Sequence, residues 1–256
     1  RHDKHGSMVL EALKAGKHVL VEKPLALTMH EIERIDEYIE NTSNHSIPIL
    51  LTGYNRRFSP YIDKIRLSLK DRSNPFIINY RMNSGYIPMD HWVHGKEGGG
   101  RNIGEACHIY DLFTALADSR LVSLSVNAIE PATEYYSWTD NFIATLSFED
   151  GSVCSLTYTA MGNNNYPKEV ADIYFDGKIC VLTDYKKLQI YGSNKPILRT
   201  SKQDKGIKNE LIAFADAINN SGDWPIPWWQ QKQVSKICFD IENLITSPQI
   251  IDSNDQ

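Results

Sequence analysis

Two short stretches of the chain combine side chains that can move protons or hold a ligand. The first is HVLVEKPLAL, residues 18–27, in which an apolar run ends in Glu-Lys-Pro. Pro24 stops a strand ladder and favours an extended backbone at Lys23, so the lysine is held at a fixed place. An ammonium there can bind a substrate hydroxyl and stabilise negative charge developing on its oxygen, and Glu22 can orient it or reach a cofactor ribose. The alternative is a polar strand exit with solvated charges, and the residues alone leave both open.

The second stretch is GGGRNIGEACHIYDL, residues 98–112. Three glycines allow close approach of the backbone, and Glu105, His108 and Leu112 share one face of a predicted helix. A helix N-terminus disfavours a protonated histidine, so we expect His108 to be neutral at about pH 7 and able to accept a proton from an alcohol. Asp111 either orients the ring or is a surface carboxylate. On residues alone, an ordinary half-buried histidine is the commoner interpretation.

Further polar and aromatic residues lie where the predicted elements end. Tyr54 and Asn55 follow an apolar run and are expected at the carboxyl end of a strand, where open parallel sheets bind ligands. Of Arg56 and Arg57, one can bind a phosphate or carboxylate and the other can pair with an acid. Trp92 can stack on a sugar ring or dock on its own domain. Ordinary loop polarity is the alternative for the residues at the strand end.

The composition is that of a soluble globular protein. About 41% of the 256 residues are hydrophobic and 23% are charged. The net charge of −5 argues against a nucleic-acid or anionic-membrane partner, and no apolar run is long enough to cross a bilayer. Four scattered cysteines without CxxC pairs indicate reduced thiols and a cytoplasmic location. Cys107, His91 and His94 fit no zinc pattern, so we expect no metal.

The first fifty-odd residues alternate between helical and strand patterns. We predict a helix over 4–15, a buried strand over 18–22, a second helix after Thr28 with Glu31 completing a capping box, and a strand over 47–54. This order is typical of the later half of a doubly wound parallel sheet.

From residue 59 onward the pattern changes. A helix after Pro60, a strand over 76–83, a long loop and a helix over about 105–117 precede short alternating runs that predict an antiparallel sheet, and two helices end the chain. The predicted fold class is therefore α/β, the C-terminal part of a Rossmann-like parallel sheet over 1–57. An α+β domain with a large, mostly antiparallel open sheet follows over 58–256, with C-terminal helices packing back.

The sequence resembles the Gfo/Idh/MocA oxidoreductases, through AGKHVLVEKPLALT with GYNRRFSP and through GGGRNIGEACHIYDL. The branch with bi-domain and polysaccharide-biosynthesis members is the most similar. The resemblance implies an NAD- or NADP-dependent dehydrogenase of sugars, cyclitols or sugar nucleotides. It also implies that Lys23 is catalytic, that His108 faces the substrate, and that subunits pair through the open sheet face.

Contacts are also expected for the other candidates, from their residue types and their places around the predicted crevice. Cofactor contacts are expected from His2, His5, Glu22, Lys23, Pro24, Asn55 and Arg56. Substrate contacts are expected from Lys23, Tyr54, Arg57, Trp92 and Asp111.

The sequence departs from the family pattern at two places. The Gly-rich phosphate loop of the family is absent, and RHDKH resembles the loop after its fourth strand, so we expect a longer polypeptide whose first part is not in this sequence. The family places an aspartate four residues before the histidine. Here that position is Gly104, and Glu105 is the candidate catalytic acid, one residue later.

Two rival interpretations stay open. The chain can be a truncated, non-catalytic fragment or a dimerisation module with weak cofactor binding. A family member with redox-neutral chemistry, such as glycoside cleavage through transient oxidation, also fits.

Overall fold

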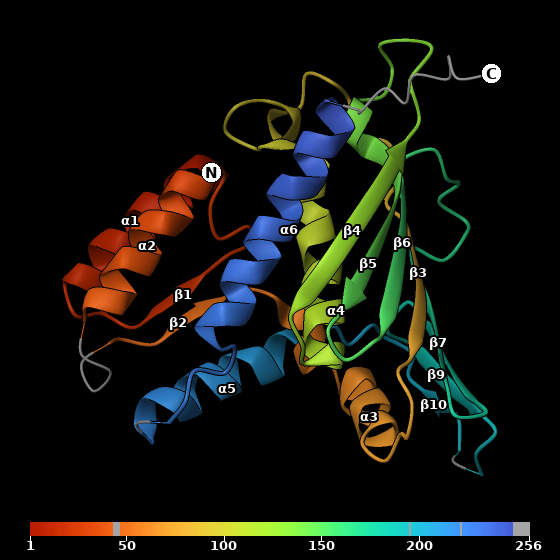
Figure 1. The fold of residues 1–256 in the computed structure, drawn as a ribbon. Coiled ribbons are helices and arrows are strands. Elements are labelled where there is room, and N and C mark those ends of the chain that lie inside the picture. Colours follow the sequence, from red (N-terminus) through yellow and green to blue (C-terminus); the bar gives the residue numbers. More distant parts are fainter. Residues whose placement is uncertain (43–46, 195, 221, 248–256) are drawn as a thin grey trace, which may run out of the picture.

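A computed structural model describes residues 1–42, 47–194, 196–220 and 222–247. Within these ranges the chain forms a two-stranded parallel sheet and an eight-stranded sheet, with helices between and around them (Figure 1). The predicted fold class, a partial parallel sheet followed by a large and mostly antiparallel one, is confirmed. None of the helices in the described ranges has the length and apolar character that a bilayer span requires.

The small sheet is built from short apolar strands. β1 and β2 run parallel, with Val19 opposite Leu50 and Val21 opposite Thr52. Helices α1 and α2 lie together on one side of it (Figure 1). The predicted capping box begins α2, because the Glu31 N–H donates to the Thr28 hydroxyl at 3.3 Å and the Thr28 N–H donates back to the Glu31 carboxylate at 3.2 Å. The bounds of these elements are α1 (His5–Lys14), β1 (Val19–Val21), α2 (Met29–Asn41) and β2 (Leu50–Thr52).

The large sheet has the strand order β10-β9-β8-β7-β3-β6-β5-β4. Strand β3 lies parallel to β6, and every other neighbouring pair is antiparallel. The bounds are β3 (Ile77–Asn83), β4 (Leu121–Ala128), β5 (Asn141–Phe148), β6 (Val153–Thr159), β7 (Glu169–Phe175), β8 (Lys178–Thr183), β9 (Lys187–Tyr191) and β10 (Leu198–Arg199).

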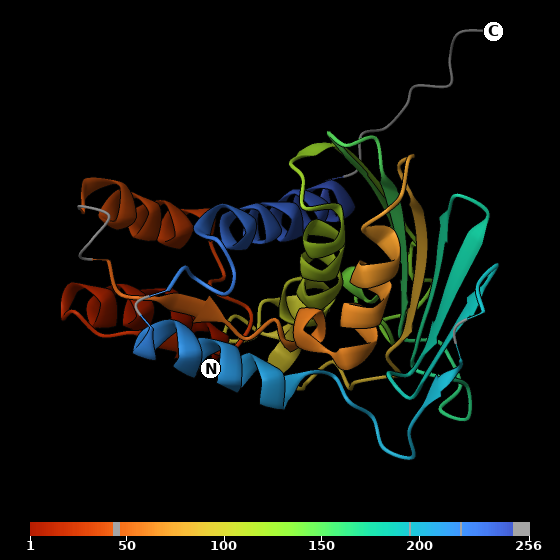
Figure 2. The same ribbon diagram turned by 90° about the horizontal axis from the view of Figure 1, so that it is seen from below.

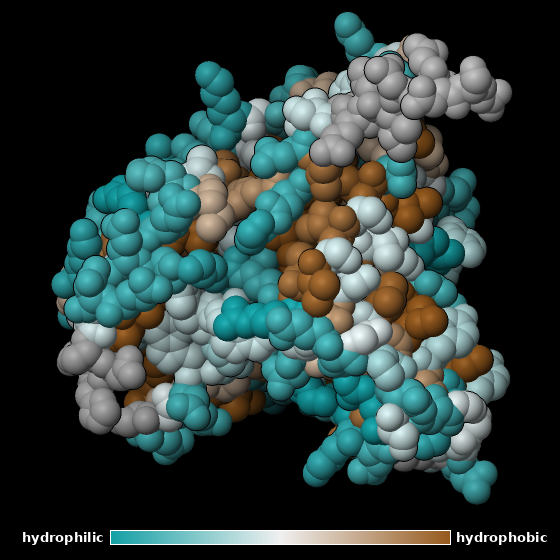
Figure 3. Space-filling model, viewed as in Figure 1, coloured by the Kyte–Doolittle hydropathy of each residue, from teal (hydrophilic) through white to brown (hydrophobic). Residues whose placement is uncertain are grey.

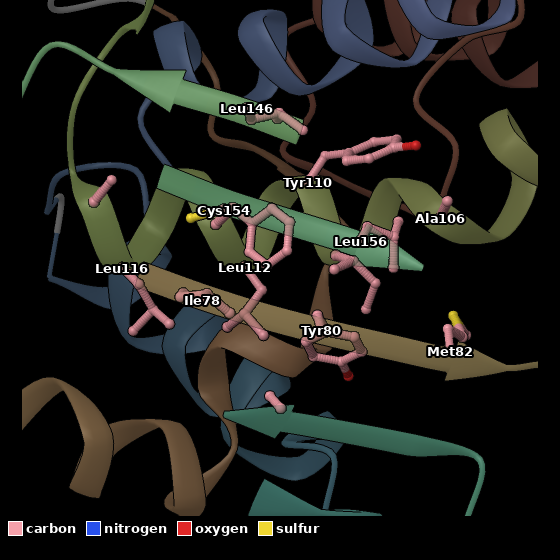
Figure 4. Close-up of a cluster of buried hydrophobic side chains, with 14 of the residues drawn as sticks. Ile78, Tyr80, Met82, Ala106, Tyr110, Leu112, Leu116, Leu146, Cys154 and Leu156 are labelled. Carbon is pink, nitrogen blue, oxygen red and sulfur yellow. The ribbon is translucent and has the colours of Figure 1, made fainter. Parts of the chain in front are cut away.

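Helices α3, α4 and α6 cover one face of this sheet, and no helix of the described ranges covers its other face, called the open face below (Figure 2). Inward-facing side chains such as Ile78, Tyr80 and Leu156 pack against Tyr110 and Leu112 of α4 (Figure 4). Because the period of a strand is two, the outward positions alternate with these and stay exposed or half-buried. The helices are α3 (Pro60–Leu69), α4 (Cys107–Ala117), α5 (Ile207–Asn219) and α6 (Trp228–Thr246).

Helix α6 connects the two sheets. The Gln231 amide lies against β2, where its oxygen accepts from the Thr52 N–H at 3.0 Å and its nitrogen donates to the Leu50 carbonyl at 3.0 Å. The Trp228 indole N–H donates to Asp36 of α2 at 2.7 Å. Hydrophobic side chains also gather along the boundary between α6 and β4 on the molecular surface (Figure 3).

The predicted helix at about 105–117 begins differently. Residues Asn102–Ala106 form a π-helical turn, and the α-helix starts only at Cys107. A π-turn accommodates one more residue than an α-turn and often occurs at functional sites. It therefore changes the directions in which the Gly104 carbonyl and the Glu105 side chain point, relative to a regular α-helix.

Candidate functional site

Lys23 lies just beyond the carboxyl end of β1, and its peptide bond to Pro24 is cis. The Lys23 ammonium donates a hydrogen bond to the carbonyl oxygen of Gly104 in the π-turn. His108 follows Gly104 by four positions, and the positive charge of Lys23 acts on its imidazole. The two motifs, although distant in sequence, are brought together.

His108 is buried in the first turn of α4, with about 7% of its surface exposed. Its ring packs edge-on against Tyr54 at a centroid distance of 6.4 Å, and its Nδ1 has no hydrogen-bond partner among the described residues. Burial, followed by the positive charges of Arg56, Lys23, Lys205 and Lys168, lowers the pKa of His108 well below its ordinary value. The imidazole is therefore neutral at about pH 7 and can accept a proton.

Glu105 points into a network of its own. Its carboxylate accepts hydrogen bonds from Lys168 at 2.8 Å, Tyr158 at 2.5 Å and Arg101 at 3.1 Å. Although burial opposes ionisation, Lys168, Tyr158 and Arg101 together hold the pKa of Glu105 at about 2. The hydrogen bond of Lys23 is taken by Gly104 instead, so a catalytic role for Glu105 stays a prediction.

Arg57 and Asp111 form a buried ion pair. Arg57 donates two hydrogen bonds to the Asp111 carboxylate, at 2.9 and 2.5 Å, and a third to Gln230 at 2.6 Å. Both charged residues are buried. Their charges form an internal ion pair between η2 (Asn55–Phe58) and α4, and the substrate contacts predicted for both stay predictions.

Arg56 is engaged in the same way. Its guanidinium donates to both carboxylate oxygens of Glu169, at 2.7 and 3.1 Å, and Lys205 and Tyr80 donate to the same carboxylate at 2.6 and 2.7 Å. These cations hold the pKa of Glu169 at about 2 despite its burial. Arg56 thus belongs to an internal charge network, and its predicted cofactor contact stays a prediction.

Several partners in these networks were not identified from the sequence. Glu169 carries one detectable signal, because it occupies an inward-facing position at the start of β7, where an acid requires a partner. Lys168, Lys205 and Arg101 are ordinary polar residues in the sequence and gave no comparable signal.

The histidines of the first turn are positioned by backbone carbonyls. The His2 Nδ1 is 2.8 Å from the Gly98 oxygen, and the His5 Nδ1 is 2.7 Å from the Pro24 oxygen. A carbonyl only accepts, so each Nδ1 carries the proton. Since burial lowers the pKa of His2, its Nε2 is an unprotonated acceptor.

Trp92 packs on the chain itself. Its ring meets the His2 ring edge-on at 4.9 Å, and the Arg1 guanidinium lies over it at 4.3 Å. Both partners come from the start of the chain, so Trp92 joins the loop before the glycines to that segment. A sugar-stacking role for Trp92 stays a prediction.

The remaining candidates lie around the ends of β1 and β2. Glu22 is exposed and lies close to Gly53, where an added Cβ would be 3.3 Å from its carboxylate. Pro24 and Asn55 are buried. Tyr54 is only about 1% exposed, and burial raises the pKa of its hydroxyl, so it lines the interior next to His108. In the described ranges, no cluster of three or more His, Cys, Asp or Glu side chains is arranged to hold a metal ion.

Comparison with known proteins identifies relatives over much of the chain. Residues 1–47 match the family described as "Oxidoreductase family, NAD-binding Rossmann fold". The chain is 29% identical over 154 residues to scyllo-inositol 2-dehydrogenase (NAD(+)) of Bacillus subtilis, covering 58% of this chain and 43% of that protein. It is 32% identical over 154 residues to oxidoreductase cns1 of Cordyceps militaris, covering 58% of this chain and 18% of that protein. The matches thus span less than half the length of these two relatives.

Among solved structures, levoglucosan dehydrogenase in complex with NADH and levoglucosan has a similar fold. The TM-score is 0.76 at 18% sequence identity, covering 96% of this chain and 76% of that chain. At this identity the likeness establishes the fold, and the chemistry has to be argued from the residues of the site.

Proposed function

We propose that this chain, which belongs to the Gfo/Idh/MocA family of oxidoreductases, acts in NAD(P)-dependent hydride transfer at a secondary alcohol or ketone of a sugar or cyclitol. The observation that carries the proposal is the hydrogen bond from the Lys23 ammonium to Gly104, one helical turn before the neutral imidazole of His108. A proton acceptor and a cation near the same point are what oxidation of an alcohol requires.

The residues of the first turn fit a nicotinamide cofactor. His2 offers an unprotonated nitrogen, and Glu22 offers an exposed carboxylate at the end of β1. Both are acceptors suited to ribose hydroxyls or a carboxamide N–H₂. When bound, the cofactor supplies a hydride acceptor or donor at C4 of its nicotinamide ring.

His108 and Lys23 have separate tasks in the oxidation direction. In oxidation the substrate hydroxyl would lose its proton to His108, and a cofactor held by the residues of the first turn would take up the hydride of the carbinol carbon. Lys23 donates a hydrogen bond to the oxygen while negative charge develops on it. In the reduction direction the same groups act in reverse.

The proposal is tested by measuring NAD and NADP reduction by the purified chain with inositols, hexoses and sugar nucleotides. A rate that falls at least about 10²-fold in Lys23→Met is the expected result. NADH titration by intrinsic fluorescence separates the rival interpretation: a chain that binds no NADH and reduces neither cofactor is a fragment or a dimerisation module.

We further propose that the open face of the large sheet pairs two copies of the chain. Ile77 and Ile143 are each 53% exposed on this face, and Tyr174 lies opposite Ile77 across the strand pair. An exposed apolar sheet face is typical of an association surface. Light scattering of Ile143→Lys against the unmodified chain tests it, and a mass unchanged by the substitution contradicts it. The four cysteines are buried thiols, which fits the predicted cytoplasmic location.

A further inference from the structure

A cavity of about 640 Å³ lies between the glycine loop (residues 94–100), η5 (Trp138–Asp140) and the C-terminal end of α6. Neither Lys23 nor His108 lines it. Its volume is in the range of sites that bind small molecules. The polar and aromatic residues of its lining include His94, Lys96, Ser137, Trp138, Thr139 and Glu242.

His94 and the neighbouring Asp140 are buried polar groups of this wall. The His94 side chain is 4% exposed and that of Asp140 is completely buried, and the His94 Nδ1 is 4.0 Å from the Asp140 Oδ1, too far for a hydrogen bond. Among the described residues, neither ring nitrogen and neither carboxylate oxygen has a hydrogen-bond partner. Because buried polar groups are nearly always hydrogen-bonded, an unpartnered imidazole on a cavity wall indicates a ligand that donates and accepts.

Thr139 and Glu242 direct two more polar groups into the same space. A Cβ added at Gly100 would be 3.2 Å from the Thr139 Oγ1 and 3.5 Å from the Glu242 Oε1, so the hydroxyl and the carboxylate approach one point. The other oxygen of Glu242 accepts from the Asn102 amide at 2.9 Å, which holds the carboxylate in this orientation. Gly100 has a φ of +80°, a conformation that suits glycine, and its missing side chain leaves the space open.

Trp138 adds an aromatic surface. It is 46% exposed, and it lines both this cavity and a neighbouring hollow of about 570 Å³, so a ligand can reach the indole ring. A flat apolar ring beside hydroxyl, carboxylate and imidazole groups suits a sugar, because the C–H face of a sugar is apolar and its hydroxyls both donate and accept.

The charges around the cavity favour a neutral ligand. Glu105 and Arg101, whose charges act on Asp140, pair with each other at 3.1 Å. The acids Asp140 and Glu242 then face one lysine of the lining, Lys96. Burial raises the pKa of Glu242 to about 7, so at about pH 7 it carries only part of a negative charge. Neither sign is in clear surplus.

We propose that this cavity is a second carbohydrate site, which binds a neutral sugar ring against Trp138 with its hydroxyls on Glu242 and His94. The site is independent of the proposed hydride transfer, because neither Lys23 nor His108 belongs to it. Binding is measurable without a cofactor and without turnover.

The test is a ligand-observed NMR titration of the purified chain with D-glucose, N-acetyl-D-glucosamine and cellobiose, without nucleotide. We expect at least one of these sugars to bind, and its affinity to stay within about twofold in Lys23→Met. A sugar that binds the unmodified chain but not Lys23→Met is held at the reacting site, and this result overturns the proposal. Absence of binding for all three sugars overturns it as well.

Trp138→Ala should weaken binding of the preferred sugar about fivefold, the effect of losing an aromatic contact. Tyr191→Ala removes an aromatic ring that is 51% exposed on β9, outside the cavity, and is the matched control.

Glu242→Gln removes the charge of one hydrogen bond at nearly constant volume and should weaken binding about tenfold. Glu33→Gln, exposed on α2, is its control. Affinity that is insensitive to both Trp138→Ala and Glu242→Gln contradicts the proposed site. Ethylammonium that binds more tightly than the sugars also overturns the proposal, because the carboxylates then select a cation.

Discussion

Lys23 and Gly104, which are 81 positions apart, are joined by a hydrogen bond from the lysine ammonium to the glycine carbonyl. This contact fixes the end of β1 against the π-turn that precedes His108. A lysine on a flexible stem loses much of its freedom when it is held in this way. The site thus obtains an oriented cation from a backbone carbonyl where the family pattern has an aspartate.

Replacing Lys23 by methionine removes the charge and keeps most of the side-chain volume. We expect kcat to fall about 10²- to 10³-fold, the usual effect of deleting one donor to a developing oxyanion. The measurement is steady-state cofactor reduction with the best substrate from the screen. Lys64→Met controls for loss of a surface lysine, and a Lys23→Met enzyme with kcat within about threefold of the unmodified one contradicts the assignment.

Local sequence patterns predicted the helices and strands well, but they predicted the ion-pair partners of the charged side chains poorly. The capping box at Thr28 was predictable because both of its hydrogen bonds join residues three apart. The ion pair of Arg57 with Asp111 was not, since it joins residues 54 positions apart and depends on how η2 meets α4. The π-turn at Asn102–Ala106 also left no signal in the sequence, because an inserted residue changes neither composition nor the apolar pattern of the following helix.

The meeting of Lys23 and His108 was predictable for a different reason. Strand ends of a parallel sheet gather at one edge, so Glu-Lys-Pro after an apolar strand already indicated a crevice. What the sequence did not reveal was which acids neutralise which bases. Which buried acids and bases form ion pairs depends on their desolvation and on their geometry in the fold. Neither can be read from the sequence.

His108→Asn should alter how stability depends on pH. The pKa of His108 is lowered in the folded chain, so below its ordinary value of about 6.5 the unfolded state binds a proton that the folded state does not. Stability of the unmodified chain therefore declines as the pH falls below about 6.5, and this part of the decline disappears in His108→Asn.

The measurement is guanidinium unfolding at several values between about pH 7 and pH 5. His30→Asn, an exposed histidine on α2, is the control. If His108→Asn and His30→Asn follow the same pH dependence, the imidazole is not held in its neutral form.

Asp111→Asn should destabilise the fold strongly. It leaves the buried Arg57 guanidinium without its anion, which typically costs about 3–5 kcal/mol of unfolding free energy. Asp63→Asn breaks an exposed pair with Arg66 and should cost less than about 1 kcal/mol. Urea unfolding compares the two, and similar losses for both would show that Arg57 finds another partner. The double variant Arg57→Met with Asp111→Leu should recover part of the loss, because no unpaired charge is left.

Glu210→Gln should stabilise the chain at alkaline pH. Burial, followed by the negative charges of Glu22 and Asp111, raises the pKa of Glu210 to about 8, and its Oε1 has no hydrogen-bond partner among the described residues. The folded state therefore keeps a proton that the unfolded state releases above its ordinary pKa of about 4.5, so stability falls as the pH rises from about 4.5 to 8. A glutamine does not ionise and avoids this loss.

We expect the melting temperature of Glu210→Gln to exceed that of the unmodified chain by at least roughly 2–4 °C at about pH 8. The two should converge at about pH 4, where the carboxyl is protonated in both states. Glu33→Gln, exposed on α2, is the matched control, and a Glu210→Gln chain that melts no higher than this control at about pH 8 contradicts the prediction.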